Sequence, residues 1–217
     1  MAVNIDKYKE ILQQLKGKAT LVAVSKTKPV ADLEVLYDLG QRDFGENYVQ
    51  ELLDKQAVMP KDIHWHFIGH LQSNKVKNIA PFVHLIHGVD SENLLAEINK
   101  HAIKNNRTIG CLLQVHIATE ETKFGFDETS LANVQMSKYT NVQIMGLMGM
   151  ASFSTDVALV REEFKKLKRL YNNLTVQNIE PTVLSMGMSG DYETAIEEGS
   201  NMIRIGSLLF GERNYNK

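Results

Sequence analysis

The feature that most restricts the fold of this chain is a regular alternation of short apolar runs with segments of helical periodicity. Eight such runs occur along the 217 residues, and several are nearly continuous in Val, Ile and Leu. Parallel strands that are buried on both faces of a sheet have this composition. The predicted strands are residues 19–24, 42–44, 64–68, 83–89, 110–117, 142–148, 182–186 and 202–205.

Apolar residues spaced three and four positions apart predict amphipathic helices between these runs. The stripes lie at 8–15, 33–37, 94–102, 157–171 and 195–196. Asp90 and Ser91 precede the third stripe as N-cap candidates, while Gly40 and Gly199 stand where helix C-termini favour glycine. In the first stripe, we expect one buried face made of Tyr8, Ile11, Leu12 and Leu15.

Eight strands that alternate with helices predict a single α/β domain over 1–217, a (β/α)8 TIM-type barrel with an N-terminal helix. A doubly wound sheet usually begins with a glycine-rich turn, whereas the first turn here, residues 24–29, contains no glycine. Little of the chain follows the eighth predicted strand. We therefore expect the N-terminal helix to complete the outer ring.

The composition is that of an ordinary globular protein, with 43% hydrophobic residues, 23% charged residues and a formal net charge of -2. It gives no reason to expect a nucleic-acid partner or a membrane surface. Without a signal-peptide pattern or an apolar run near the roughly 20 residues that span a bilayer, the expected location is cytoplasmic. Cys111 lies in an apolar run and is expected to be a buried thiol, and no metal site is expected.

Polar and glycine-rich segments end five of the predicted strands, at 25–28, 45–47, 69–72, 185–189 and 204–207. In a barrel of this kind the functional site lies at these carboxyl ends. The last two segments are rich in Gly and Ser and follow strands seven and eight, where phosphate sites are frequent. Either segment alone is more typical of turn and capping residues, but the two together favour an anion site.

Two charged residues stand out within this frame. Lys26 has the same strand parity as Val22 and Val24, which predicts an inward side chain that could form an imine with an aldehyde. A lysine at a strand end is more often a solvated charge, so the case depends on its neighbours. Arg204 interrupts an apolar strand and needs a partner there, either a structural carboxylate or a bound ligand.

Several long strings carry a resemblance to a known family. They read AVSKTKP at 23–29, FGEN at 44–47 and WHFIGHLQSNK at 65–75, with further matches at 184–189, 203–206 and 210–211. In this order, over nearly the whole chain, the sequence closely resembles the pyridoxal phosphate homeostasis proteins. The resemblance implies the barrel of the alanine racemase N-terminal domain, a fold-type III architecture that binds pyridoxal phosphate.

The resemblance also implies roles for particular residues. Lys26 matches the lysine that holds pyridoxal 5'-phosphate as a Schiff base, and Arg204 matches the arginine that faces the pyridine nitrogen. An arginine stays protonated, which discourages a proton on that nitrogen and disfavours strong carbanion chemistry. The expected cofactor-binding residues are Lys26, Asn47, Ser185, Met186, Gly187, Arg204, Gly206 and Ser207, with no catalytic residue assigned.

The role that the resemblance implies is that of a carrier or regulator of the vitamin B6 cofactor pool, without established turnover. Its expected partners are the small-molecule cofactor and pyridoxal phosphate-dependent apoenzymes, and the expected state is a monomer. The sequence departs from the family at His116, where an asparagine is expected. His70 lies in a matching string but receives no role.

Three other functions stay open from the sequence. A small amino-acid racemase would use Lys26 with an acid/base group on the opposite face, for which Tyr48 and Tyr192 are candidates, although both are expected to pack at helix starts. An aldolase-like barrel would use Lys26 on a sugar phosphate directly. An interaction protein would use the basic run at 161–169, which is more typical of a solvated helix face.

Overall fold

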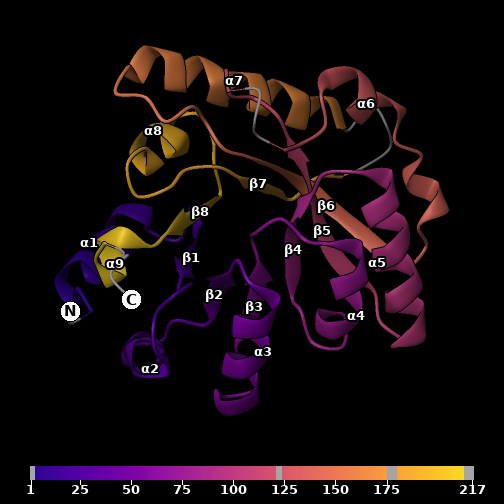
Figure 1. The fold of residues 1–217 in the computed structure, drawn as a ribbon. Helices are drawn as coiled ribbons and strands as arrows, with labels where there is room; N and C mark the ends of the chain where they lie inside the picture. The colour runs from indigo at the N-terminus through magenta and orange to yellow at the C-terminus, as the bar shows by residue number, and fades with distance from the viewer. Residues whose placement is uncertain (1–2, 121–123, 175–179, 213–217) are drawn as a thin grey trace.

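A closed barrel of eight parallel strands forms the centre of the molecule in the computed structural model, which describes residues 3–120, 124–174 and 180–212 (Figure 1). The strands follow one another around the ring in chain order, and β1 pairs with β8 to close it. The predicted fold class and all eight predicted strands are confirmed. They are β1 Thr20–Val24, β2 Asp43–Glu46, β3 His64–Phe67, β4 Leu85–Val89, β5 Ile109–Val115, β6 Val142–Gly149, β7 Val183–Ser185 and β8 Met202–Ile205.

Helices cover the outside of the barrel. The described α-helices are α1 Ile5–Leu15, α2 Val30–Asp38, α3 Val49–Val58, α4 Val76–Ile79, α5 Glu92–Lys104, α6 Glu128–Asn133, α7 Val157–Asn173, α8 Tyr192–Glu197 and α9 Ser207–Phe210. Ser91 caps α5 as predicted, because its side chain accepts a hydrogen bond from the Leu94 amide. The sequence did not predict α3, whose buried residues are Leu52 and Lys55, so that a lysine stands where an apolar stripe would continue.

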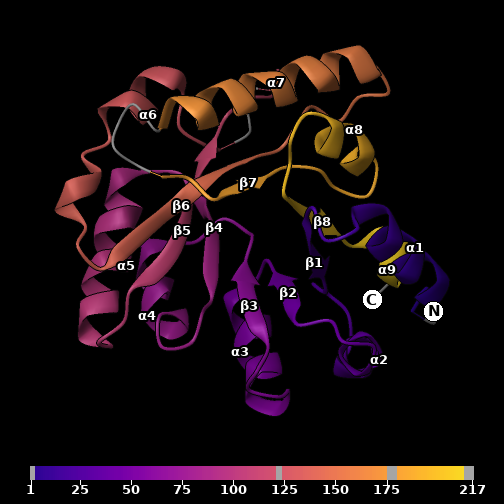
Figure 2. The same cartoon turned by 180° about the vertical axis from the view of Figure 1, so that it is seen from behind.

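The N-terminal helix completes the ring beside the short last helix, as expected. In both views α1 and α9 lie side by side (Figures 1 and 2), and the Asn4 amide donates to the Leu209 carbonyl at 2.8 Å. The predicted buried face was wrong at one position. Leu12 is 40% exposed, because it lies about 100° around the helix from buried Ile11.

Two apolar clusters stabilise this architecture. The larger one lies between the strands and the helices and includes Cys111, a fully buried thiol whose pKa is raised by burial. The smaller one is made of strand residues of the opposite parity and fills part of the barrel interior. Its buried members are Val22, Leu85, Leu112, Met148, Val183 and Met202.

Across the described residues, no helix has both the length and the apolar character that crossing a membrane requires.

Strand β6 contains a glycine that its neighbour requires. The register between β5 and β6 shifts between Cys111 and Leu112, and Gly146 at the shift has a φ of +149°. A Cβ placed there would collide with the carbonyl oxygen of Val183 on the adjacent strand. Both the backbone conformation and the close strand approach therefore exclude a side chain at this position.

Gly146→Ala is expected to lower the free energy of unfolding by about 2–4 kcal/mol, since a strained φ and a backbone collision add together. Urea denaturation measures the change. Gly190→Ala is the matched control, because a Cβ at Gly190 meets no atom within 4 Å. Equal unfolding midpoints for the two variants would contradict the expectation.

Candidate functional site

The loops that carry the predicted site residues meet at the carboxyl ends of neighbouring strands. Val24 pairs with Gly45 and Ala23 pairs with Ile205, so the segments with Lys26, Asn47 and Gly206 follow adjacent strands. Two hydrogen bonds join the loop after β7 to strand β8 and to the residue that follows it. The Gly206 amide donates to Ser189 Oγ at 3.3 Å, and the Arg204 amide donates to the Gly187 carbonyl at 3.0 Å.

The two lysines of the first loop have different surroundings. Lys26 is half-buried in the turn after β1. Because β1 ends at Val24, strand alternation does not set the direction of this side chain, and its inward orientation stays a prediction. Lys28 Nζ donates to the carbonyls of Phe210, Gly211 and Glu212 at 2.6, 3.1 and 3.3 Å. Lys28 is thus committed to the end of α9.

A strained residue in this turn is held by a glutamate. Thr27 has a φ of +64°, a left-handed conformation that a β-branched residue rarely adopts. Its amide donates to Glu51 Oε1 at 2.6 Å, and Glu51 is in turn paired with Lys55 at 2.7 Å. The residue after Lys26 is therefore held in place by helix α3.

Lys55 is the centre of a buried ionic cluster beneath the turn. Its Nζ also donates to the Ser25 carbonyl and to Glu46 Oε1, both at 2.7 Å, and the Ser25 hydroxyl donates to the same glutamate oxygen at 2.6 Å. The Glu46 side chain has no exposure and that of Lys55 has 5%. Burial raises the pKa of Glu46, against the opposing charge and hydrogen bond of Lys55.

The loops after β7 and β8 have the geometry of a tight cradle. Gly187 has a φ of +98°, and a Cβ there would lie 2.7 Å from the Cβ of Ala195, so only glycine fits. Ser185 and Met186 are fully buried, whereas Ser207 is exposed at the start of α9. Across the strand ends, Asn47 Oδ1 is a buried atom without a hydrogen-bond partner. An orphaned acceptor of this kind is available to a bound ligand.

Arg204 is buried in β8 with only 4% exposure. It donates from Nη1 to Ser185 Oγ at 2.7 Å and from Nη2 to the Gly149 carbonyl at 3.1 Å. Within the described residues it forms no ion pair with a carboxylate, so the structural ion pair considered from the sequence is absent there. Burial lowers the pKa of Arg204 to about 10, although the charge of Asp191 acts in the opposite direction. The guanidinium is therefore charged at neutral pH.

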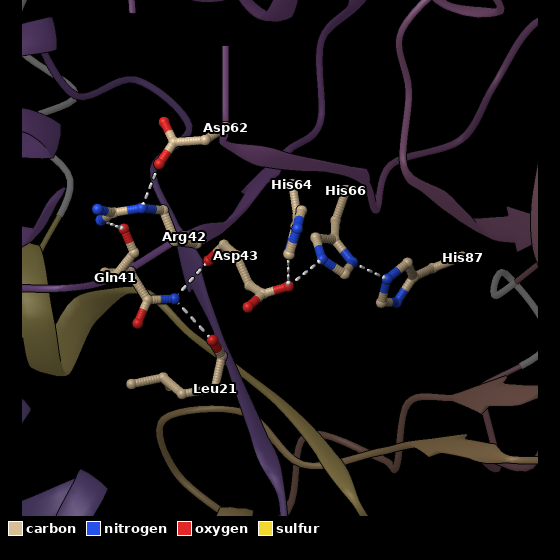
Figure 3. Close-up of polar contacts among 8 residues, drawn as sticks. All are labelled: Leu21, Gln41, Arg42, Asp43, Asp62, His64, His66 and His87. Carbon is tan, nitrogen blue, oxygen red and sulfur yellow. Dashed lines mark hydrogen bonds and ion pairs between the residues drawn. The ribbon is translucent and has the colours of Figure 1, made fainter. Parts of the chain in front are cut away.

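A chain of polar contacts leads from Arg204 through Ser185 to two buried histidines inside the barrel, His87 and His66. The sequence analysis did not identify either histidine as a site residue. His87 Nδ1 lies 3.3 Å from Ser185 Oγ, and His87 Nε2 lies 2.9 Å from His66 Nδ1. His66 Nε2 lies 3.0 Å from Asp43 Oδ1 at the start of β2 (Figure 3). A signal existed, because His87 interrupts an apolar strand as Arg204 does.

The pKa values along this chain reflect its burial. His87 is fully enclosed, and its pKa is lowered well below 6.5 by burial and by the neighbouring His66, Arg204 and His84. Burial alone would raise the pKa of Asp43. The hydrogen bond from His66 and the charges of His66 and His64 outweigh it, so the pKa of Asp43 is lowered overall.

His70 and His116, which were noted in the sequence, do not belong to this series of hydrogen bonds and have other partners in the protein. His70 Nδ1 lies 3.0 Å from Asp90 Oδ2, and its ring stacks on Phe124 with centroids 4.5 Å apart. His116 Nε2 lies 2.8 Å from the Glu120 carbonyl. Within the described part of the chain, no group of three or more His, Cys, Asp or Glu side chains could hold a metal ion.

The residues that the alternative functions would use are exposed or have other partners. The Tyr192 hydroxyl donates to Gln14 of α1 at 2.8 Å, while Tyr48 is 57% exposed at the start of α3. In the basic run, Arg161 pairs with Glu197, the last residue of α8, and with Glu198, which follows it, and the run's last residue pairs with Glu128. Acidic partners therefore neutralise much of that run.

Fold and site together define a class: a (β/α)8-barrel protein with a lysine, a buried arginine and two Gly/Ser-rich loops at the carboxyl ends of its strands. The model of the alanine racemase N-terminal domain matches residues 1–214. A pyridoxal phosphate homeostasis protein of Aquifex aeolicus is 44% identical over 203 residues, covering 91% of this chain and 88% of the relative. One from Schizosaccharomyces pombe is 39% identical over 212 residues, covering 94% and 89%.

Solved structures agree. PipY of Synechococcus elongatus, solved with pyridoxal phosphate bound, is 36% identical with a TM-score of 0.88, over 95% of this chain and 99% of PipY. Alanine racemase of Bartonella henselae, at 16% identity and a TM-score of 0.76, shares the fold over 95% of this chain and 62% of the racemase. The chain belongs to the pyridoxal phosphate homeostasis proteins of the alanine racemase N-terminal domain family.

Lys55→Met is expected to lower the free energy of unfolding by about 3–5 kcal/mol, because it leaves Glu46 buried without its cation. Guanidinium denaturation measures the loss. Adding Glu46→Gln should recover part of it, since the unpaired charge is then removed. Lys61→Met, at an exposed lysine, is the control and should change stability by less than about 0.5 kcal/mol. A loss below about 1 kcal/mol for Lys55→Met would refute the ionic role.

Acid should destabilise the protein through His87. Because the folded state holds its pKa far below 6.5, the unfolded chain binds a proton below that pH that the folded chain does not. His87 should therefore lower the free energy of unfolding by roughly 1.4 kcal/mol per pH unit below about pH 6.5. His84, whose pKa burial lowers to about 4, should add a similar slope down to about pH 4. The lowered pKa of Asp43 acts in the same direction, but only near and below about pH 3.8. Urea unfolding at pH 7, 6 and 5 tests this, and unchanged stability over that range would disprove it.

Proposed function

We propose that this chain holds pyridoxal 5'-phosphate as a Schiff base on Lys26 and takes part in pyridoxal phosphate homeostasis. The observation that carries the proposal is the convergence of Lys26, Arg204 and the two Gly/Ser-rich loops on neighbouring strands. PipY, which is similar over nearly its whole length, was solved with this cofactor bound. The names of the curated relatives support the homeostasis role.

The cradle fits the chemistry of the group. The Lys26 amine would add to the aldehyde carbon, and one water would leave as the C=N bond forms. Among the described residues, Arg204 donates two hydrogen bonds of the five that a guanidinium offers, which leaves donors for a ligand. The buried Oδ1 atom of Asn47 has no hydrogen-bond partner, so it is available to accept a hydrogen bond near the pyridine ring of the cofactor.

The loops after β7 and β8 supply the proposed phosphate site. Gly187 and Gly206 bring main chain close to a ligand without a side chain between, and Ser207 adds an exposed hydroxyl. Met186 packs in the core and holds the first of these loops. Ser185 belongs to the same segment, and its hydroxyl accepts a hydrogen bond from Arg204.

The racemase alternative has weaker support. It needs a second acid/base group opposite Lys26, and the Tyr192 hydroxyl is bonded to Gln14 of the N-terminal helix. We infer further that the protein acts as a monomer in the cytoplasm and passes its cofactor to pyridoxal phosphate-dependent apoenzymes. Light scattering of the purified protein tests the monomer.

Lys26→Ala should abolish the covalent adduct that borohydride reduction traps after incubation with pyridoxal phosphate. Peptide mass mapping locates the adduct, and the absorbance band of the bound cofactor should disappear with it. Lys28→Ala is the matched control two residues away. It should keep the adduct, because Lys28 is bonded to the end of α9.

Circular dichroism establishes that both variants are folded. An adduct that maps to Lys28, or one that survives Lys26→Ala, would overturn the assignment of the lysine. The absence of any adduct in the unaltered protein would overturn the proposed function and favour a barrel that uses its lysine without a cofactor.

A further inference from the structure

The buried hydrogen-bonded chain from Arg204 to Asp43 has chemically different ends. A guanidinium only donates hydrogen bonds, whereas an ionised carboxylate only accepts them. Between these ends lie Ser185, His87 and His66, each of which can both donate and accept. When both histidine rings are neutral, these ends allow only one direction of donation between them.

Following that direction assigns every proton. Arg204 donates to Ser185 Oγ, and the hydroxyl hydrogen is then free to donate to His87 Nδ1. His87 therefore carries its proton on Nε2 and donates to His66 Nδ1 at 2.9 Å. His66 likewise carries its proton on Nε2 and donates to Asp43 at 3.0 Å. The two neutral rings then share one tautomer.

We propose that Asp43, His66, His87 and Ser185 form a positioning chain that orients the Arg204 guanidinium from the opposite end of the barrel. The chain would set how Arg204 faces a ligand in the mouth, and its link to pyridoxal phosphate rests on the proposed function. Asp43 is the first residue of β2, and its side chain is 25% exposed. Solvent at the amino-terminal end thus reaches the first acceptor.

Reversing the chain has a clear chemical cost. If His66 gained a second proton, its Nδ1 would donate to His87, whose remaining proton would move to Nδ1 and face Ser185. Ser185 Oγ would then accept from both His87 and Arg204, and its own hydrogen would lose its partner. The titratable and charged groups that face His87 are His66, His84 and Arg204, and a positive charge on any of them opposes a positive charge on His87.

Nuclear magnetic resonance of ¹⁵N-labelled histidine in the ligand-free full chain tests the direction. Both His66 and His87 should show the neutral Nε2–H tautomer at pH 7. His64→Gln is the matched control. His64 contacts Asp43 at 3.3 Å but is not one of the residues that link Asp43 to Arg204, so its loss should leave both tautomers unchanged. An Nδ1–H tautomer at either ring, or an imidazolium at pH 7, would overturn the proposal.

Asp43→Ala tests the positioning role, because this residue lies at the far end of the barrel from the mouth. It should weaken pyridoxal phosphate binding about tenfold, the worth of roughly one hydrogen bond, and produce mixed tautomers at His66. Asp43→Asn keeps an acceptor oxygen and should restore the affinity to within about twofold of the unaltered protein.

A folded Asp43→Ala protein with unchanged affinity would overturn the positioning role, whatever its tautomers. Circular dichroism verifies the fold of both Asp43 variants. If the unaltered protein formed no adduct on Lys26, the proposed function would fail. The tautomers of the ligand-free protein would still decide whether the chain runs in the assigned direction.

Discussion

Buried cations constrain this molecule more than any other feature. A charge enclosed by protein costs several kcal/mol unless hydrogen bonds and opposite charge compensate for it. Two such cations lie near the strand ends: Lys55 beneath the first loop and Arg204 inside the ring. The strand register and the positions of α3 and β7 have to supply acceptors for both, so the site is built around these two requirements.

The two cations are compensated in opposite ways. Lys55 is bonded to two carboxylates and a carbonyl, which makes its surroundings rigid and fixes the strained turn next to Lys26. Arg204 is bonded to a hydroxyl and a carbonyl, both neutral. Its charge therefore stays available to a ligand, while its orientation depends on hydrogen bonds that continue into the barrel.

The eight strands and the barrel were predictable, because the alternation of apolar runs with helical stripes is a local signal. Helix α3 was not, because its inner face contains Lys55 in place of an apolar residue. The residues at the mouth were identified from their places at strand ends. The histidine chain required the register: His66 and His87 are 21 residues apart and Ser185 is 98 residues from His87, so no spacing rule connects them.

The bond from Lys28 to the carbonyls after α9 joins segments 182 residues apart. Together with the pairing of β1 and β8, it makes the first loop depend on the last residues described. During synthesis on the ribosome, the amino-terminal half emerges well before these partners exist. The nascent chain therefore carries the Lys26 loop without the carbonyls that hold Lys28 until α9 has been synthesised, so this loop can reach its folded form only after β8 and α9 have joined the barrel.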